Sequence, residues 1–391
     1  MPHPCNRRRN PWSTAALVAA CLTTGVPADA APNVAPTVLA DAAWALGGEA
    51  HFEEHLGRHA LALRTGRAVA RDVALENGTI DFAIALSGRR SFAYVDFRIG
   101  ADDDHEEIYL RAHKSRLPDA LQYAPVFHGE SEWQLYHDPG ATAPVEIPAG
   151  RWLPARLVIA GSRAAFYLGD LSQPALVVTR LARGGATKGP IGFHGFATRD
   201  VPAGETAVWI SGVSVSTAPP TQDLAALAPA EAPAPAGSLL RLEASAPFEA
   251  GGTLLREPPS PFVEACTLTA DAAGRFEPYR ELARPKRDRA MGIWLRLPFR
   301  ALTAGVRTVQ VGFSDAITVF LDGRPIAASD ASYSYDAPRQ DGLMTLSQLA
   351  VFLPLSAGEH ELLFGLVDDF GGMGLVARFD DRVGLDLGGG Q

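Results

Sequence analysis

The sequence predicts an all-β protein: two antiparallel β-sandwich domains joined by a linker rich in alanine and proline. Its 391 residues are 47% hydrophobic and 20% charged, which is enough chain for two domains with cores of their own. The 38 glycines and 30 prolines disfavour long helices and are typical of short strands joined by turns. Runs of alternating apolar and polar residues on both sides of the linker supply the strands themselves.

The first thirty residues are typical of an export signal. Three arginines at 7–9 precede a mostly apolar stretch at 13–26, and Ala28-Asp29-Ala30 has the small residues of a cleavage site. We therefore expect residues 1–30 to be a signal peptide and the protein to be exported, to the bacterial periplasm or outside the cell. An alternative remains open, because Val18-Ala19-Ala20-Cys21 resembles a lipobox and would place a lipid anchor on Cys21.

Charge and cysteine content exclude several classes of partner. The signal holds three arginines and one aspartate, so without it the net charge changes from −9 to −11. An acidic chain repels phosphate backbones, which disfavours nucleic acid as a partner. No later apolar run reaches the roughly 20 residues of a transmembrane helix. Because Cys5 and Cys21 fall in the signal, Cys266 is predicted to be a lone cysteine, and we expect no cofactor.

A linker divides the chain at residues 218–237. This segment contains eight alanines and five prolines but no aromatic residue. Proline fixes φ and removes amide donors, so such a segment is predicted to be a semi-extended spacer that buries nothing. The predicted domains are therefore 36–217 and 238–382, and residues 383–391 form a glycine-rich tail.

The first domain consists of short strands bounded by turn residues. Alternating or apolar runs predict strands at 79–86, 92–99, 108–112, 157–168 and 209–215. No helix of three turns is predicted in this domain. Antiparallel strands joined by polar turns predict a sandwich in which one face of each sheet packs inward.

A polar face is expected where two of these strands pair. Tyr94, Asp96 and Arg98 share one side of the strand at 92–99. The same side of the strand at 107–113 carries Glu107, Tyr109, Arg111 and His113. Aromatic rings cover the apolar face of a pyranose while guanidinium and carboxylate groups bind its hydroxyls, so this mixture suits sugar binding. The alternative is a solvated sheet face with cross-strand ion pairs.

Residues after the second strand extend this predicted surface. Gln122 lies in a segment where polar and aromatic residues alternate, beside Asp119 and Tyr123. Trp133 is predicted to lie at the rim, either as a sugar platform or as an edge residue of the core.

The second domain repeats the strand pattern with different residues. Runs at 308–313, 317–321, 351–355 and 361–367 predict strands, and Asp322-Gly323 predicts a tight hairpin turn. Tyr333, Tyr335 and Asp336 lie in a long loop from which they could reach a ligand.

Two resemblances follow from these segments. The segments GRWLPARLVIAGSRAAFYLGD and GPIGFHGF belong to a series of elements over 36–217 that resembles the concanavalin A-like lectin/glucanase jelly roll, near its laminin-G-like branch. Within it, YLRAHKSRLPDALQYAPVFHGESEWQLY is similar to a stretch of uncharacterised exported bacterial proteins. VGFSDAITVFLDGRPI and VFLPLSAGEHELLFGLVDDFGGMG resemble a galactose-binding-like jelly roll over 238–382. The resemblances imply folds that often bind glycans, although a fold alone fixes no function.

Signatures of catalysis and of metal binding are weak. The Glu-x-Asp-x-Glu arrangement of glucanases is missing, so an enzyme on this fold would have to use Asp96, Glu107 or His113 as acid and base. The acidic run at 102–106 could contribute to a calcium loop, although a solvated hairpin tip is the default expectation. The H-x-x-E-H spacing at 51–55 needs a helix to bind zinc, and Gly57 interrupts it.

The sequence therefore predicts an exported, non-catalytic protein that binds an extracellular or envelope glycan through a sheet face of the first sandwich. Two alternatives stay open: a glycan hydrolase or lyase on the same fold, and a structural module that contacts other envelope proteins.

Overall fold

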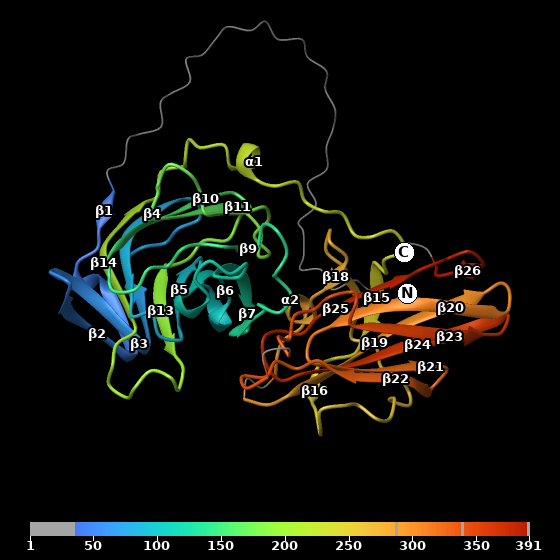
Figure 1. Cartoon of the computed structure of the whole chain (residues 1–391). Coiled ribbons are helices and arrows are strands. Elements are labelled where there is room, and N and C mark those ends of the chain that lie inside the picture. Colours follow the sequence, from blue (N-terminus) through green and yellow to red (C-terminus); the bar gives the residue numbers. More distant parts are fainter. Residues whose placement is uncertain (1–35, 286–287, 338–339, 389–391) are drawn as a thin grey trace, which may run out of the picture.

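A computed structural model describes residues 36–285, 288–337 and 340–388. The predicted signal peptide, with Cys21, lies outside these ranges. Within them the chain consists almost entirely of strands, and all paired strands are antiparallel. The prediction of an all-β sandwich architecture is therefore confirmed. Figure 1 shows the first sandwich, coloured blue to green, beside the second, coloured yellow to red.

The first sandwich is built from one sheet that curls on itself. Along its main path the strands follow the order β12-β11-β10-β4-β14-β3-β13-β5-β6-β7-β8. Its strands are β1 Thr37–Val38, β2 Trp44–His55, β3 Arg58–Ala70, β4 Gly78–Leu86, β5 Ser91–Phe97, β6 His105–Arg111, β7 Leu121–Phe127, β8 Glu130–Ser131, β9 Thr142–Ala143, β10 Leu153–Ala160, β11 Arg163–Leu168, β12 Leu176–Val178, β13 Gly192–Ala197 and β14 Val208–Ser216. Short 3-10 turns occupy Asp41–Ala43, Ala101–Asp103 and Ala112–Lys114.

Alternation along the strands decides which side chains form the core. On β5, the side chains of Ala93, Val95 and Phe97 are buried in the hydrophobic core, and those between them lie on the opposite face. One predicted element differs, because the run at 157–168 is two strands. β10 and β11 form a hairpin that turns at Gly161, whose φ of 58° favours glycine.

The second sandwich packs an eight-stranded sheet against a four-stranded one. The larger sheet contains β15 Arg241–Ala244, β16 Phe248–Glu249, β17 Cys266–Thr269, β19 Met291–Ala301, β21 Ala316–Leu321, β22 Arg324–Asp330, β24 Gly358–Asp368 and β26 Leu385–Asp386. The smaller contains β18 Arg275–Phe276, β20 Gly305–Phe313, β23 Leu349–Leu355 and β25 Leu375–Phe379, and α2 spans Pro278–Glu281.

Three details of this sandwich bear on the predictions. Asp322 and Gly323 both have positive φ, at 50° and 75°, and join β21 to β22 as the predicted hairpin turn. β26 pairs with β19, so part of the predicted tail belongs to the sheet. Cys266 is buried and disulfide-bonded, which differs from the expectation of a lone cysteine.

The linker is not a free spacer. Helix α1, Leu224–Leu227, buries Leu224 against β10, β11 and β12. Asp223 caps the helix by accepting hydrogen bonds from two backbone amides, and Gln222 donates to the hydroxyl of Tyr167. Further along, Glu231 pairs with Arg180 at 3.2 Å. The expectation that residues 218–237 bury nothing is therefore wrong, because the leucine supplies an apolar anchor that the alanine- and proline-rich composition hides.

Leu224→Ala is expected to lower the free energy of unfolding by about 2 kcal/mol, because it leaves a cavity between the linker and the sheet. Leu227→Ala, in the same helix but 39% exposed, is the matched control and should change stability by less than about 0.5 kcal/mol. Urea denaturation of both variants tests this. Equal, small effects would mean that the linker does not dock in solution.

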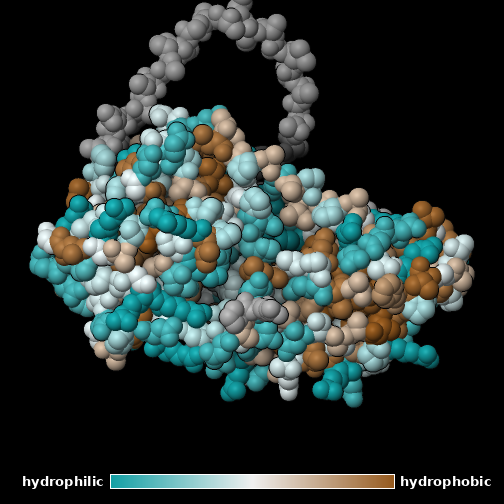
Figure 2. Space-filling view, viewed as in Figure 1, coloured by the Kyte–Doolittle hydropathy of each residue, from teal (hydrophilic) through white to brown (hydrophobic). Residues whose placement is uncertain are grey.

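Two features of the outer surface complete the description. No helix in the described residues is long and apolar enough to cross a membrane. Hydrophobic surface gathers over the second sandwich, at the right of Figure 2. Among the residues of this sandwich, Val306 on β20 and Phe352 on β23 are 62% and 65% exposed.

Candidate functional site

The predicted polar face forms where β13, β5, β6 and β7 lie side by side. β5 and β6 pair as expected, with Tyr94 opposite Tyr109 and Asp96 opposite Glu107. On one side β13 places His194 opposite Tyr94, and on the other β7 places Gln122 opposite Tyr109. Four neighbouring strands thus present a continuous row of polar and aromatic side chains, which is the geometry that an extended ligand needs.

An aromatic band runs along this face and continues onto the second sandwich. The rings of Phe92 and Phe196 lie 5.9 Å apart, and those of Tyr94 and Tyr109 stack at 4.8 Å. The guanidinium of Arg111 lies over Phe92, Tyr109 and Trp133. Trp133 in turn contacts two rings of the second sandwich, and the aromatic band is therefore defined as Phe92, Tyr94, Tyr109, Trp133, Phe196, Tyr333 and Phe370.

The two ends of the aromatic band are accessible and its middle is not. Phe196 and Phe370 are 47% and 54% exposed. Phe92, Tyr94 and Trp133 are half-buried, whereas Tyr109 is buried. A ligand can therefore reach the rings of β5 and β13 at one end and those of the second sandwich at the other.

A charged cluster lies beside the aromatic band. Asp96, Glu107 and His194 offer ligand atoms that all lie within 4.8 Å of one another. His194 bonds to Asp96 at 3.0 Å, and Arg67 on β3 donates to the other oxygen of Asp96 at 3.0 Å. His105 Nε2 lies 3.8 Å from both Asp96 and Glu107. We call these five residues the β5–β6 cluster.

Electrostatics within the β5–β6 cluster favour charged groups. Burial opposes ionisation of Asp96, but His194, His105 and Arg67 outweigh it and hold the pKa of this carboxyl below its usual range. Burial also opposes the charged form of His105, yet Asp96 and Glu107 raise its pKa to about 9. The cluster thus favours the ionised form of Asp96 and the charged form of His105.

Three of the predicted binding residues hold the protein together instead of facing a ligand. Arg111 donates to the Tyr109 hydroxyl at 2.8 Å, and that hydroxyl donates to Gln122 Oε1 at 2.8 Å. Gln122 Nε2 donates to the backbone carbonyls of Trp133 and Tyr136 at 2.8 and 2.6 Å. This series of hydrogen bonds fixes the segment that carries Trp133, so Tyr109, Arg111 and Gln122 are positioning residues.

Arg98 is a correction to the predicted face. β5 ends at Phe97, and Arg98 has a φ of 56°, which turns its side chain away from the strand's alternation. The guanidinium is fully buried and donates to the backbone carbonyls of Glu76, Gly161 and Gly184. Arg98 therefore joins three loops and does not contribute to the polar face.

His113 lies just beyond the predicted face. β6 ends at Arg111, and His113 sits in the following 3-10 turn with its ring 5.3 Å from that of Phe92. Burial and the cations around it, Arg90 foremost, lower its pKa to about 4. His113 is thus a neutral neighbour of the aromatic band at physiological pH.

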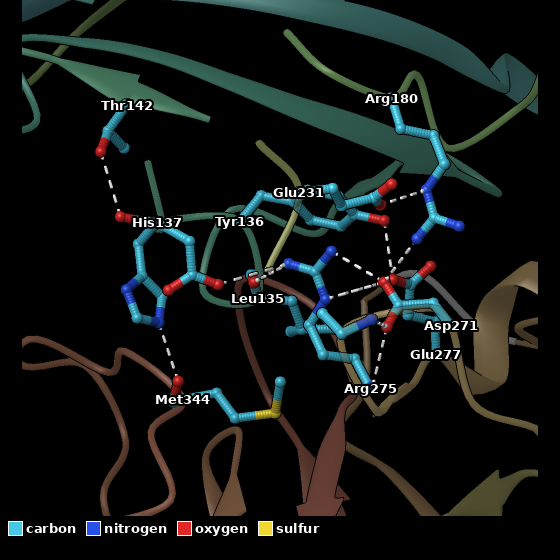
Figure 3. Close-up of polar contacts among 12 residues, drawn as sticks. Leu135, Tyr136, His137, Thr142, Arg180, Glu231, Asp271, Arg275, Glu277 and Met344 are labelled. Carbon is cyan, nitrogen blue, oxygen red and sulfur yellow. Dashed lines mark hydrogen bonds and ion pairs between the residues drawn. The ribbon is translucent and has the colours of Figure 1, made fainter. Parts of the chain in front are cut away.

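Polar contacts at the domain junction fix the segment that follows Trp133 against the second sandwich (Figure 3). Tyr136 donates to Glu277 at 2.7 Å, Arg275 donates to the carbonyl of Leu135 at 2.8 Å, and His137 Nε2 bonds to the carbonyl of Met344 at 2.7 Å. A hollow of about 260 Å³ beside these contacts is lined largely by charged side chains. On the far side of Trp133, Arg90 donates to the Tyr333 hydroxyl at 2.8 Å.

Buried carboxyl groups also meet at this junction. Glu130 and Glu132 come from the first sandwich, and Asp315 and Asp368 come from the second. Burial raises the pKa of all four, and mutual repulsion adds to the effect. Neither oxygen of Glu132 has a hydrogen-bond partner. Carboxyl groups whose pKa burial raises are therefore a structural part of the contact between the two sandwiches.

Sequence reasoning missed several residues of this site. His194 and Phe196 alternate within the segment GFHGF of β13, so their shared face was readable, but nothing local shows that β13 lies beside β5. Arg67 lies on β3, which borders β13 from a distant part of the sequence, whereas His105 lies on β6 beside its sequence neighbour β5. The roles of Tyr333 and Phe370 depend on how the second sandwich meets the first.

Comparison with known proteins adds likenesses of fold. No family model and no curated protein matches the chain. Among solved structures, the carbohydrate-binding module CBM66 from Bacillus subtilis has 12% identity and a TM-score of 0.32, over 44% of this chain and 96% of that module. The β-glucanase of Bacillus licheniformis has 10% identity and a TM-score of 0.34, over 47% of this chain and 98% of that enzyme. A Bacillus subtilis protein with a galectin-like fold has 10% identity and a TM-score of 0.35, over 44% and 89%.

Proposed function

We propose that the chain is an exported carbohydrate-recognition protein whose glycan lies along the aromatic band. The observation that carries this proposal is the exposed end of the band. There Phe92, Tyr94 and Phe196 lie next to one another, with His194 stacked on Tyr94 at 3.8 Å. Such rings cover the apolar faces of successive pyranoses, while the imidazole and Arg67 are placed to bind hydroxyls.

The length of the aromatic band supports a polymer as the ligand. It leads from β13 across β5 and β6 to loops of the second sandwich, and both ends are exposed while the middle is covered. A chain of several sugars can engage both ends at once, and two linked contacts bind more tightly than either alone. A mono- or disaccharide would contact one end only.

Phe196→Ala is expected to weaken binding of a recognised polysaccharide by at least about tenfold, which corresponds to about 1.4 kcal/mol. The substitution removes an exposed ring, so the fold should be unchanged. Phe352→Ala, also exposed but on the second sandwich away from the band, is the matched control. A glycan and polysaccharide screen of the full chain, followed by calorimetric titration of the three proteins, makes the comparison.

Two results would contradict recognition through the band. Equal affinity of the Phe196 variant and wild type would place the glycan elsewhere. Failure of the full chain to bind any glycan would move the assignment to a module that contacts other envelope proteins.

Cleavage of the bound glycan is a second candidate, favoured by one observation. Asp96 and Glu107 lie opposite each other on β5 and β6 with ligand oxygens within 4.8 Å, close to the roughly 5 Å of retaining glycosidases. Both carboxyls are buried, which keeps them from a ligand that lies on the surface of the band. Release of reducing ends by wild type and its loss in Glu107→Gln would establish hydrolysis, whereas binding without any release would exclude it.

A further inference from the structure

We propose that the β5–β6 cluster is a binding site for one divalent transition-metal ion such as Zn²⁺, held by Asp96, Glu107, His105 and His194. These residues come from three adjacent strands of the first sandwich. A metal at this position would tie the strands together beside the aromatic band.

The first support is the distance between the ligand atoms. Those of Asp96, Glu107 and His194 lie within 4.8 Å of one another, and His105 Nε2 lies 3.8 Å from both carboxylates. Two ligands of a tetrahedral zinc lie about 3.4 Å apart, since each is about 2.0–2.2 Å from the ion. The distances named here exceed this value by at most about 1.4 Å, and movement of the side chains toward one another would close the shell around an ion.

The second support is a polar atom that lacks a partner. His105 is only 4% exposed, and its Nε2 accepts and donates no hydrogen bond. Its other nitrogen, Nδ1, donates to the carbonyl of Asp103 at 2.7 Å, which orients the ring so that Nε2 points at the carboxylates. A metal-binding histidine usually donates its second nitrogen to a backbone carbonyl in this way.

The carboxylates are oriented by the same principle. Ser131 donates to Glu107 Oε1 at 2.6 Å, which leaves Oε2 turned toward His105. Arg67 donates to Asp96 Oδ2, which leaves Oδ1 near both histidines. His105, Glu107 and Asp96 thus each have one atom held by a neighbour and the other directed at the other ligands.

Charge and ligand chemistry select the ion. Asp96, Asp103 and Glu107 place three acidic side chains around one arginine, Arg67, so the site favours a cation. Two imidazoles with two carboxylates suit Zn²⁺ or Mn²⁺, whereas Ca²⁺ prefers oxygen ligands alone.

The test titrates the metal-free full chain with ZnCl₂ by calorimetry and with CoCl₂ by visible absorption, with CaCl₂ as the comparison ion. We expect one equivalent of Zn²⁺ and a Co²⁺ spectrum of tetrahedral type, with weaker binding of Ca²⁺. Glu107→Gln, close in shape to the wild type, should weaken Zn²⁺ binding by at least about 100-fold, and Ser131→Ala by about tenfold. His51→Ala removes an exposed histidine of β2 and should change nothing.

Two results would overturn the site: no bound equivalent of Zn²⁺ or Co²⁺, or equal binding by Glu107→Gln and wild type. The same proteins are titrated with the recognised polysaccharide separately. Metal binding without glycan binding would support the metal site and contradict the proposed function. Glycan binding without metal binding would support the proposed function and contradict the metal site.

Discussion

Asp368→Asn is expected to abolish much of the decrease in the free energy of unfolding that the wild type shows between pH 5 and pH 8. Burial, with Glu130 and Asp315 adding repulsion, raises the pKa of Asp368 to about 8. An unfolded aspartate releases its proton near pH 4, so between these values the folded protein binds a proton that the unfolded chain does not. The free energy of unfolding therefore falls with rising pH, by about 1.4 kcal/mol for each unit between the two pKa values.

The surroundings of Asp368 explain why asparagine is tolerated. Tyr279 donates to Asp368 Oδ2 at 2.8 Å, and an amide oxygen accepts the same bond. Arg284 lies 3.7 Å from that oxygen and also pairs with Glu130. Glu132, whose pKa burial raises well above its usual value, adds a further buried carboxyl that repels Asp368. A neutral side chain suits this environment over the whole pH range.

Chemical denaturation at pH 5, 6, 7 and 8 tests the expectation on wild type, Asp368→Asn and Asp369→Asn. Asp369 is the exposed neighbour, so its variant should follow the wild-type profile. Groups such as His113, which titrate elsewhere in the molecule, contribute equally to all three curves. Parallel profiles for wild type and Asp368→Asn would show that this carboxyl is ionised in the folded protein.

Arg98→Met is expected to lower the free energy of unfolding by about 3–5 kcal/mol, the usual cost of removing one partner from a buried charged contact. Methionine resembles the arginine stem in size, but it donates no hydrogen bond. The carbonyls of Glu76, Gly161 and Gly184 would each lose a donor inside the protein. Those three loops would then have no common anchor.

Urea denaturation of Arg98→Met and Arg89→Met separates this effect from a general loss of charge. Arg89 is exposed and makes only a surface ion pair with Glu205, so its variant should stay within about 0.5 kcal/mol of wild type. A change of less than about 1 kcal/mol in the Arg98 variant would mean that water replaces the guanidinium in all three contacts.

Features that depend only on the residues within one strand could be predicted from the sequence. That Tyr94 and Asp96 share a face with Tyr109 and Glu107 was predictable, because alternation assigns side chains to faces within each strand, whereas the register that sets Tyr94 opposite Tyr109 was not. Arg98 was misplaced because the same alternation was extended one residue too far. A positive φ at a residue other than glycine leaves little trace in the sequence.

The other missed features depend on contacts between distant segments. β13 lies between β3 and β5, so His194 meets Arg67 and Tyr94, which are a hundred or more residues away in the chain. The linker's anchor, Leu224, is one leucine among alanines and prolines. The carboxyls of the junction come from both sandwiches, and each of their segments alone is typical of a solvated turn.

The segment that carries Trp133 has a consequence for how this chain can evolve. It belongs to the first sandwich, yet Glu132, Gln134 and Tyr136 are buried against loops of the second. A recombination event that joined the first sandwich to an unrelated neighbour would leave these side chains without the surface that matches them. The two sandwiches are therefore inherited as a pair, unlike modules on a flexible tether that can be shuffled independently, and substitutions on one side of the junction constrain those accepted on the other.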